Sequence, residues 1–179
     1  MDDFTIASAR NGDRESISRL LRELQDPWYR LCLSLLRDPE KARDATQETA
    51  VRFLRQLPGF RGESQIRTWS LGIAINVVRE IRRRARPDAN LDDVDGALLE
   101  DESQQSPAEM VEQSERRENL HAALDGLPDR QREAVVLRFF ESLSTEQTAR
   151  AMQCAEGTVK ATLHKALRNL KESLKMLVL

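Results

Sequence analysis

Glycine, proline and aromatic residues are scarce in this chain, whose 179 residues include 7 Gly, 6 Pro and an aromatic content of 4%. Runs of β-branched residues are scarce too, which leaves few segments suited to the pleated, half-buried surface of a sheet. Since Gly and Pro are the residues that most disfavour a helix interior, their rarity favours helices. The composition therefore predicts an all-α fold.

Cysteine and histidine are nearly absent, with two of each. Cys32 and Cys154 stand far apart and outside any CxxC or His-containing cluster, whereas a structural zinc site needs about four closely spaced ligands. We therefore expect no metal and no cofactor. Two reduced, mostly buried thiols are typical of a cytoplasmic protein, and the cytoplasm is the location we expect.

Long apolar runs and catalytic motifs are missing as well. No stretch approaches the ~20 apolar residues of a membrane-spanning helix, and the acidic start MDDFTIASARNGD lacks the apolar segment of a signal peptide. We expect no membrane insertion. The sequence contains no GxSxG, no phosphate-binding Gly-Lys-Ser/Thr loop and no HExxH, so an enzyme is not expected.

Charged residues are abundant but unevenly distributed: they make up 32% of the chain, yet the formal net charge is −2. Residues 67–86 contain six Arg and one Glu, residues 87–115 contain ten acids and no Lys or Arg, and residues 157–175 contain five cations and one Glu. Two basic segments separated by an acidic one suggest two surfaces for polyanions. Each basic segment alone also fits the solvated face of an ordinary helix.

Helical periodicity and turn signals predict two small helical domains, at 1–86 and 108–179, joined by an acidic flexible linker at 87–107. Capping and proline signals start the helices of the first domain, and Pro58-Gly59 ends one of them. The predicted starts are Asp13, Asp26-Pro27, Asp38-Pro39 and Gln65, and the last two helices run to about Leu57 and Arg84.

The second domain contains a helix-turn-helix layout, in which a short helix, a tight turn and a longer basic helix follow a predicted helix at 129–140. Ser144 and Gln147 form a capping-box pattern that starts the short helix, and the basic helix begins near Gly157. Its cationic face is left for DNA, unless that side is merely solvated. Base-edge contacts are predicted for Thr158, Lys160, Ala161 and His164, and phosphate contacts for Lys165 and Arg168.

The predicted helix at 65–84 has a polar side that combines an aromatic ring, amides and arginines. Such a surface suits unpaired nucleic acid, because bases stack on the ring while cations hold the backbone, and the preceding Gly-bearing loop at 60–64 is placed to hold an extruded base. For Trp69, the alternative is a core position beside Ile73 and Val77. The residues of this side are Gln65, Trp69, Gly72, Asn76, Arg79 and Arg83.

The predicted helix at 39–57 has an outward side with an exposed valine among polar residues. This pattern fits a protein-binding face, although a single exposed Val is also common in ordinary surfaces. The outward residues are Asp44, Gln47, Glu48, Val51 and Arg55.

Two stretches resemble a known family. DATQETAVRFLRQLPGFRGESQIRTWSLGIAINVVREIRRR, residues 44–84, resembles region 2 of the extracytoplasmic-function subfamily of bacterial sigma-70-type sigma factors. LPDRQREAVVLRFFESLSTEQTARAMQCAEGTVKATLHKALRNLKESL, residues 127–174, resembles region 4. Gln153 stands where the family usually has a turn Gly, Ala155 where it usually has a capping Ser, and Thr162 where many members have Arg.

The resemblance implies a subunit that binds core RNA polymerase and directs it to promoter DNA. It implies that one helix docks on the clamp helices of the largest polymerase subunit, that the second domain meets the flap region, and that an anti-sigma factor holds the protein inactive. The implied polymerase-binding residues are Asp44, Gln47, Glu48, Val51 and Arg52. The implied −10 residues are Arg61, Gln65, Trp69, Asn76, Arg79, Arg82 and Arg83, and Arg138 joins the basic helix at the −35 element.

Two other functions fit the same patterns. A stand-alone helix-turn-helix regulator would bind duplex DNA without polymerase, and an adaptor would bind polymerase or another partner without DNA. The polar side of the helix at 65–84 is superfluous under both, which favours the sigma factor.

Overall fold

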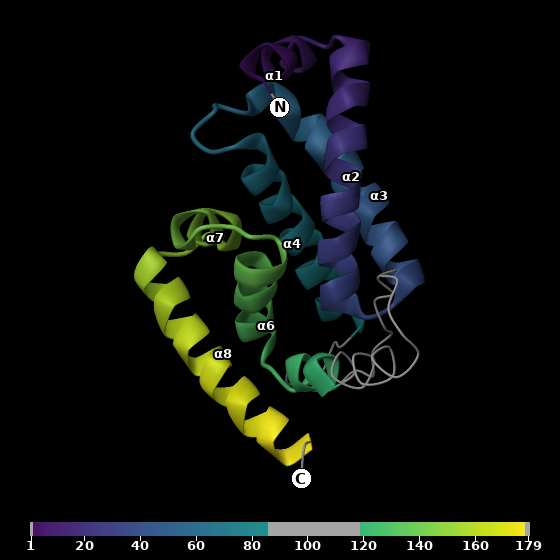
Figure 1. The fold of residues 1–179 in the computed structure, drawn as a ribbon. Coiled ribbons are helices and arrows are strands. Elements are labelled where there is room, and N and C mark those ends of the chain that lie inside the picture. The colour runs from purple at the N-terminus through teal and green to yellow at the C-terminus, as the bar shows by residue number, and fades with distance from the viewer. Residues whose placement is uncertain (1, 86–118, 178–179) are drawn as a thin grey trace, which may run out of the picture.

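The computed structural model describes residues 2–85 and 119–177, and every structural statement below concerns these residues. They form an N-terminal unit, residues 2–85, and a C-terminal unit, residues 119–177, which lie directly against each other (Figure 1). The predicted linker at 87–107 lies outside the described residues, as does the start of the second predicted domain. The described residues form helices and turns, as the composition predicts.

The N-terminal unit consists of four α-helices and a short 3₁₀ turn. Their bounds are α1 Asp3–Arg10, α2 Arg14–Leu36, α3 Pro39–Gln56, η1 Leu57–Gly59 and α4 Ile66–Ala85. The start signals read from the sequence are confirmed at α2 and α3: the Asp13 carboxylate accepts from the Ser16 N–H at 2.8 Å, and the Asp38 carboxylate accepts from the Glu40 N–H at 3.0 Å. Hydrogen bonding from Ser16 holds the pKa of Asp13 below its ordinary value, and the Lys41 N–H, 3.1 Å from Asp38 Oδ1, does the same for Asp38.

The helix break predicted at Asp26-Pro27 is wrong, because α2 runs without interruption from Arg14 to Leu36. Pro27 removes one backbone donor and normally kinks or ends a helix. Here the buried stripe of α2 continues across it: Leu24, Pro27, Trp28 and Leu31 all lie in the core. Packing of this stripe on α3 and α4 therefore outweighs the local proline signal.

The C-terminal unit begins with helical residues 119–125, followed by α6 Asp129–Val135, the π-helical turn η2 Val136–Phe140, α7 Thr145–Met152 and α8 Glu156–Leu177. The single helix predicted at 129–140 thus changes to a wider turn halfway, where the Glu141 N–H donates to the Val136 carbonyl at 3.0 Å. The capping box of α7 is confirmed, with Gln147 N–H donating to Ser144 Oγ at 3.1 Å and the Gln147 side chain accepting from Ser144 N–H at 2.8 Å.

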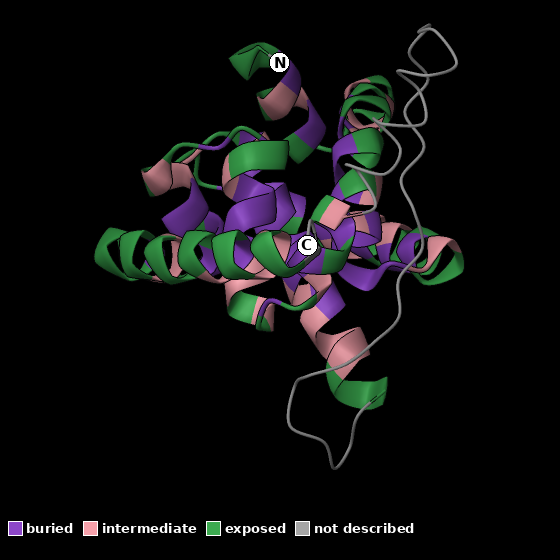
Figure 2. Cartoon of the chain, turned by 60° about the horizontal axis from the view of Figure 1, so that its bottom comes forward, coloured by how far each residue is buried: buried purple, intermediate pink, exposed green. Residues whose placement is uncertain are grey.

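One hydrophobic core extends through both units, and the helices are buried where they face one another (Figure 2). Leu137, Ala149 and Met152 of the C-terminal unit belong to the same buried cluster as Trp28 and Phe53. A second cluster is confined to the C-terminal unit, where Val135 and Ala166 hold α6 and α8 together. No helix among residues 2–85 and 119–177 is long and apolar enough to cross a membrane.

The turn between α7 and α8 contains a strained backbone position. Gln153 adopts the left-handed conformation, with φ 56° and ψ 50°, which glycine tolerates and residues with a Cβ disfavour. We expect Gln153→Gly to raise the free energy of unfolding by up to about 1 kcal/mol, because relief of strain exceeds the extra chain entropy of glycine. Thermal unfolding followed by circular dichroism measures the change. A decrease in stability would show that the Gln153 side chain makes a larger contribution than its backbone costs.

Candidate nucleic-acid and polymerase interfaces

The outward face of α8 is an uncovered cationic surface. The helix is anchored by Val159 and Ala166, both fully buried, while all six contact residues predicted on it are exposed. Within the described part of the chain, no carboxylate forms an ion pair with Lys160, Lys165 or Arg168. The predicted α8 residues thus share one solvent-facing side, as a recognition helix requires. Arg138 lies apart on η2, half-buried, with its guanidinium 5.7 Å from the Phe139 ring centre.

The polar side of α4 borders a cavity of about 520 Å³, whose far wall belongs to the C-terminal unit. Trp69, Asn76, Arg79 and Arg83 line it together, so the structure brings together most of the residues predicted on this side. Arg150 and Gln153, at the end of α7, line it from the C-terminal unit, and α3 contributes Arg52 and Gln56. The α4 surface therefore lies partly against the C-terminal unit, while Arg83 remains exposed.

Trp69 combines the two positions considered from the sequence, a place in the core and a place on the polar side of α4. Its ring packs on Phe53 at 5.6 Å and on Phe60 at 4.9 Å between centroids, and it is half-buried against the core. The rest of the indole lines the cavity beside α4 and a second one of about 340 Å³. A ring held in this way is rigid on one side and available for stacking on the other.

The loop before α4 surrounds this second cavity. Gly59, Phe60, Arg61 and Ser64 line it with Trp69, and its volume of about 340 Å³ lies in the range of small-ligand pockets. Arg150 of α7 also lines it and donates to the Glu63 carbonyl. The neighbouring Gln147 amide donates to Gln65 Oε1 at 3.3 Å. The C-terminal unit thus contacts the loop predicted to hold an extruded base.

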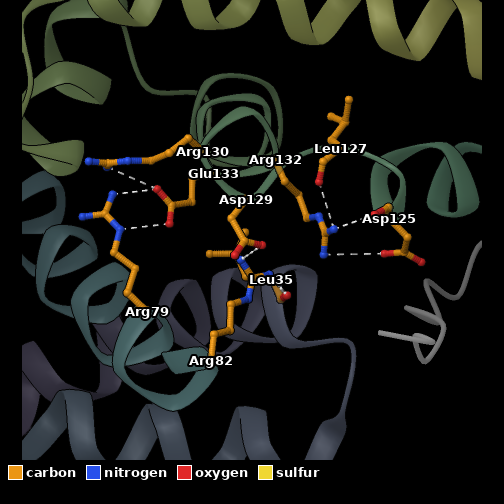
Figure 3. A network of polar contacts seen from close by, with 9 residues as sticks. All are labelled: Leu35, Arg79, Arg82, Asp125, Leu127, Asp129, Arg130, Arg132 and Glu133. Atoms are coloured by element: carbon orange, nitrogen blue, oxygen red, sulfur yellow. Dashed lines mark hydrogen bonds and ion pairs between the residues drawn. The ribbon is translucent and has the colours of Figure 1, made fainter. Parts of the chain in front are cut away.

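Arginines of α4 are bound by carboxylates of α6 (Figure 3). Arg79 donates to Glu133 through two parallel bonds, Nε to Oε1 at 2.9 Å and Nη2 to Oε2 at 2.6 Å, and also donates to Asn76 Oδ1 at 3.3 Å. Arg82 donates to Asp129 at 2.5 Å and to the Leu35 carbonyl. The Glu133 side chain is 1% exposed, so its charge depends on Arg79 for compensation.

A third ion pair joins the two units near the start of α4. Arg67 donates to the Glu141 carboxylate at 2.5 Å and to the Glu141 carbonyl at 3.0 Å, and Arg30 lies 3.8 Å from the same carboxylate. Burial raises the pKa of Glu141 above its ordinary value, while the two arginines act in the opposite direction. The same carboxyl thus faces arginines of both α2 and α4.

The outward face of α3 remains uncovered. Asp44, Gln47 and Val51 are exposed, as the predicted polymerase-binding surface requires. Arg52 differs from the expectation of a free contact residue, because it donates to Glu80 of α4 at 2.6 and 2.8 Å and to Glu48 at 2.6 Å. These bonds lower the pKa of Glu80. Arg52 therefore also fixes α3 against α4.

The acidic partners of the α4 arginines were not predicted from the sequence. A signal for Glu133 exists, because it occupies the same helical face as Val136 and Leu137, both buried. A carboxylate on an apolar face needs a counterion, yet the periodicity does not say which arginine supplies it. His121 also lies between the units, with its Nδ1 3.0 Å from Nη1 of Arg37.

The comparisons with known proteins assign a family to both units. The family model of Sigma-70 region 2 matches residues 20–87, and that of Sigma-70, region 4 matches residues 117–170. The RNA polymerase sigma-H factor of Pseudomonas aeruginosa is 29% identical, with 99% of this chain and 95% of the relative covered. The ECF RNA polymerase sigma factor SigX of Bacillus subtilis is 31% identical over 91% of this chain and 86% of the relative.

A solved structure shows the same fold. The sigma factor RpoE of Bartonella quintana, in complex with the anti-sigma factor NepR, matches with a TM-score of 0.69 and 24% identity, over 88% of this chain and 96% of that one. The chain therefore belongs to the extracytoplasmic-function subfamily of sigma-70-type RNA polymerase sigma factors. The stand-alone regulator is not favoured by these matches.

Proposed function

We propose that this sigma factor directs core RNA polymerase to promoters by dividing recognition between its two units. The C-terminal unit reads the duplex −35 element with α8, and the N-terminal unit melts the −10 element and holds one unpaired strand along α4. The single observation that supports this division most strongly is the pairing of two different cationic surfaces. One is the open face of α8, and the other is the α4 side that combines Trp69 with arginines and a base-sized loop cavity.

In this proposal, α3 is the polymerase-binding helix. Asp44, Gln47, Glu48 and Val51 present an uncovered face, and Arg52 holds that face in register with α4. The partner is the clamp-helix region of the largest polymerase subunit, while the C-terminal unit meets the flap region. An anti-sigma factor is a further partner, supported by the relative of known structure that is bound to one.

Catalysis is not assigned to the chain. Binding energy on the two surfaces offsets the cost of unpairing DNA, and nucleotide addition belongs to the polymerase. Among the described residues no group of His, Cys, Asp and Glu is arranged to hold a metal ion.

Transcription from purified components tests the proposal. We expect core polymerase plus this chain to produce discrete promoter-specific transcripts from genomic templates, including one that contains the region upstream of its own coding sequence. Core enzyme alone should produce only nonspecific background. Footprinting of duplex DNA by the chain without core enzyme, together with no specific transcript from any genomic template, would contradict the proposal and favour a stand-alone regulator.

A further inference from the structure

The two proposed DNA-binding surfaces differ in whether their charges are already neutralised. Lys160, Lys165 and Arg168 on α8 are exposed and, within residues 2–85 and 119–177, have no acidic partner. On α4, by contrast, Arg79 and Arg82 are bound by Glu133 and Asp129. Both carboxylates come from the C-terminal unit. Two arginines of the proposed −10 surface are therefore already paired within the chain, whereas the proposed −35 surface is open.

The geometry on α4 resembles arginine recognition of phosphate. A planar guanidinium binds a carboxylate or a phosphate through the same pair of parallel hydrogen bonds, and Arg79 makes such a pair with Glu133. Arg130 approaches the same carboxylate at 3.6 Å. Asp129 and Glu133 lie one helical turn apart on α6, which matches the spacing of Arg79 and Arg82 on α4 (Figure 3). Two carboxylates thus bind guanidinium donors of the kind that also bind phosphates.

Close backbone packing supports the same arrangement independently of charge. Gly72 lies on α4 between Trp69 and Asn76, and a Cβ added to it would come within 3.1 Å of the Ala151 carbonyl oxygen and 3.4 Å of Ala151 Cα. Both atoms belong to the backbone of α7, which cannot move aside as a flexible side chain would. A glycine inside a helix lowers the stability of that helix. Here the missing side chain of Gly72 allows α7 to pack directly on α4.

We propose that Asp129 and Glu133 form an internal docking surface for the DNA-binding arginines of α4, so that the C-terminal unit competes with the −10 strand. The inference rests on the proposed role of α4. In the closed chain of this structure Arg79 and Arg82 of the −10 surface are bound by acids of α6, Arg83 remains exposed, and the −35 surface is free. Binding of the −10 strand requires the units to separate, after which water hydrates both the arginines and the carboxylates.

The competition has a measurable consequence. When only a fraction of molecules is open, the apparent dissociation constant for the −10 strand is the intrinsic constant divided by that fraction. Removing the internal carboxylates should therefore strengthen binding of single-stranded DNA by free protein, without any new contact to the DNA.

The first test neutralises the docking surface with Asp129→Asn/Glu133→Gln, which keeps side-chain size. Fluorescence resonance energy transfer between dyes attached at Arg43→Cys and Lys171→Cys, in a Cys154→Ser background, reports separation of the units. Burial raises the pKa of the Cys32 thiol to about 12, so this thiol stays unlabelled. We expect lower transfer, and affinity of unlabelled protein for a single-stranded DNA 20-mer about tenfold higher than wild type. The control Glu156→Gln/Glu172→Gln changes net charge equally at exposed positions of α8 and should change affinity less than about threefold.

The second test acts from the other unit, so that misfolding of one variant cannot decide the outcome. Gly72→Ala should also lower transfer while retaining the helical circular dichroism of the wild type, because Ala favours a helix interior. Unchanged transfer in both variants, or lowered transfer with unchanged DNA affinity, would overturn the docking proposal. Neither readout contains polymerase. Failure of the proposed function would instead show as absence of specific transcripts from the wild-type chain with core enzyme.

Discussion

Lys160→Glu/Arg168→Glu is expected to weaken binding of a promoter duplex by the polymerase holoenzyme about 100-fold or more. Both side chains are exposed on the outward face of α8. Each lost DNA contact costs about 1–3 kcal/mol, and reversed charges add repulsion from phosphates. The affinity is measured by titrating holoenzyme onto a duplex selected from random fragments with the wild-type chain. Its salt dependence should also become shallower, because fewer counterions are released.

The matched control lies on the same helix. Lys171→Glu/Lys175→Glu makes the same change of net charge one to two turns further along α8, at exposed positions. We expect a loss of less than about tenfold there, since only the N-terminal part of a recognition helix reaches the bases. Both double variants should retain wild-type affinity for core polymerase. Equal losses of duplex binding in the two variants would contradict the assignment of Lys160 and Arg168, and a parallel loss of core binding would do so as well.

Trp28→Ala is expected to destabilise the protein by about 3–5 kcal/mol, the cost of removing a fully buried large aromatic side chain. Trp28 is completely buried, packs against Phe53 at 5.3 Å between ring centroids, and donates from Nε1 to Ser70 Oγ at 3.0 Å. It therefore joins α2, α3 and α4 at one point. Calorimetry should show the melting temperature lowered by roughly 10 °C, given about 2–4 °C per kcal/mol in a chain of this size.

An exposed aromatic residue provides the control for this prediction. Phe4 on α1 is 81% exposed, and Phe4→Ala should change the free energy of unfolding by no more than about 0.5 kcal/mol. Similar melting shifts for Trp28→Ala and Phe4→Ala would show that the aromatic core of the N-terminal unit contributes less than its burial indicates. Trp28→Phe should recover part of the loss, because it refills most of the volume but not the hydrogen bond to Ser70.

Local signals in the sequence predicted the features that local interactions determine. Asp13 and Asp38 begin helices because their carboxylates bind backbone donors within the next three residues. The Ser144–Gln147 capping box works in the same way. The face of α8 followed from helical periodicity, which places Val159 inside and Lys160 outside. These interactions need no knowledge of the rest of the chain.

Tertiary packing determined what the sequence could not predict. Pro27 reads as a helix start, yet the buried stripe around Trp28 carries α2 through it. Arg79 and Glu133 are 54 residues apart, so their pairing depends on how the two units meet. Trp69 reads equally as core and as binding surface because it serves the aromatic core on one side and lines a cavity on the other.

Permanganate probing of promoter thymines tests the division of labour between the two units most directly, because permanganate oxidises unpaired thymines. We expect reactive thymines at the −10 element only when core polymerase and this chain are both present. The Lys160→Glu/Arg168→Glu variant should lose that reactivity at limiting holoenzyme. A promoter that stays double-stranded with both components present, while the chain remains bound to core enzyme, would contradict the proposed roles of the two units.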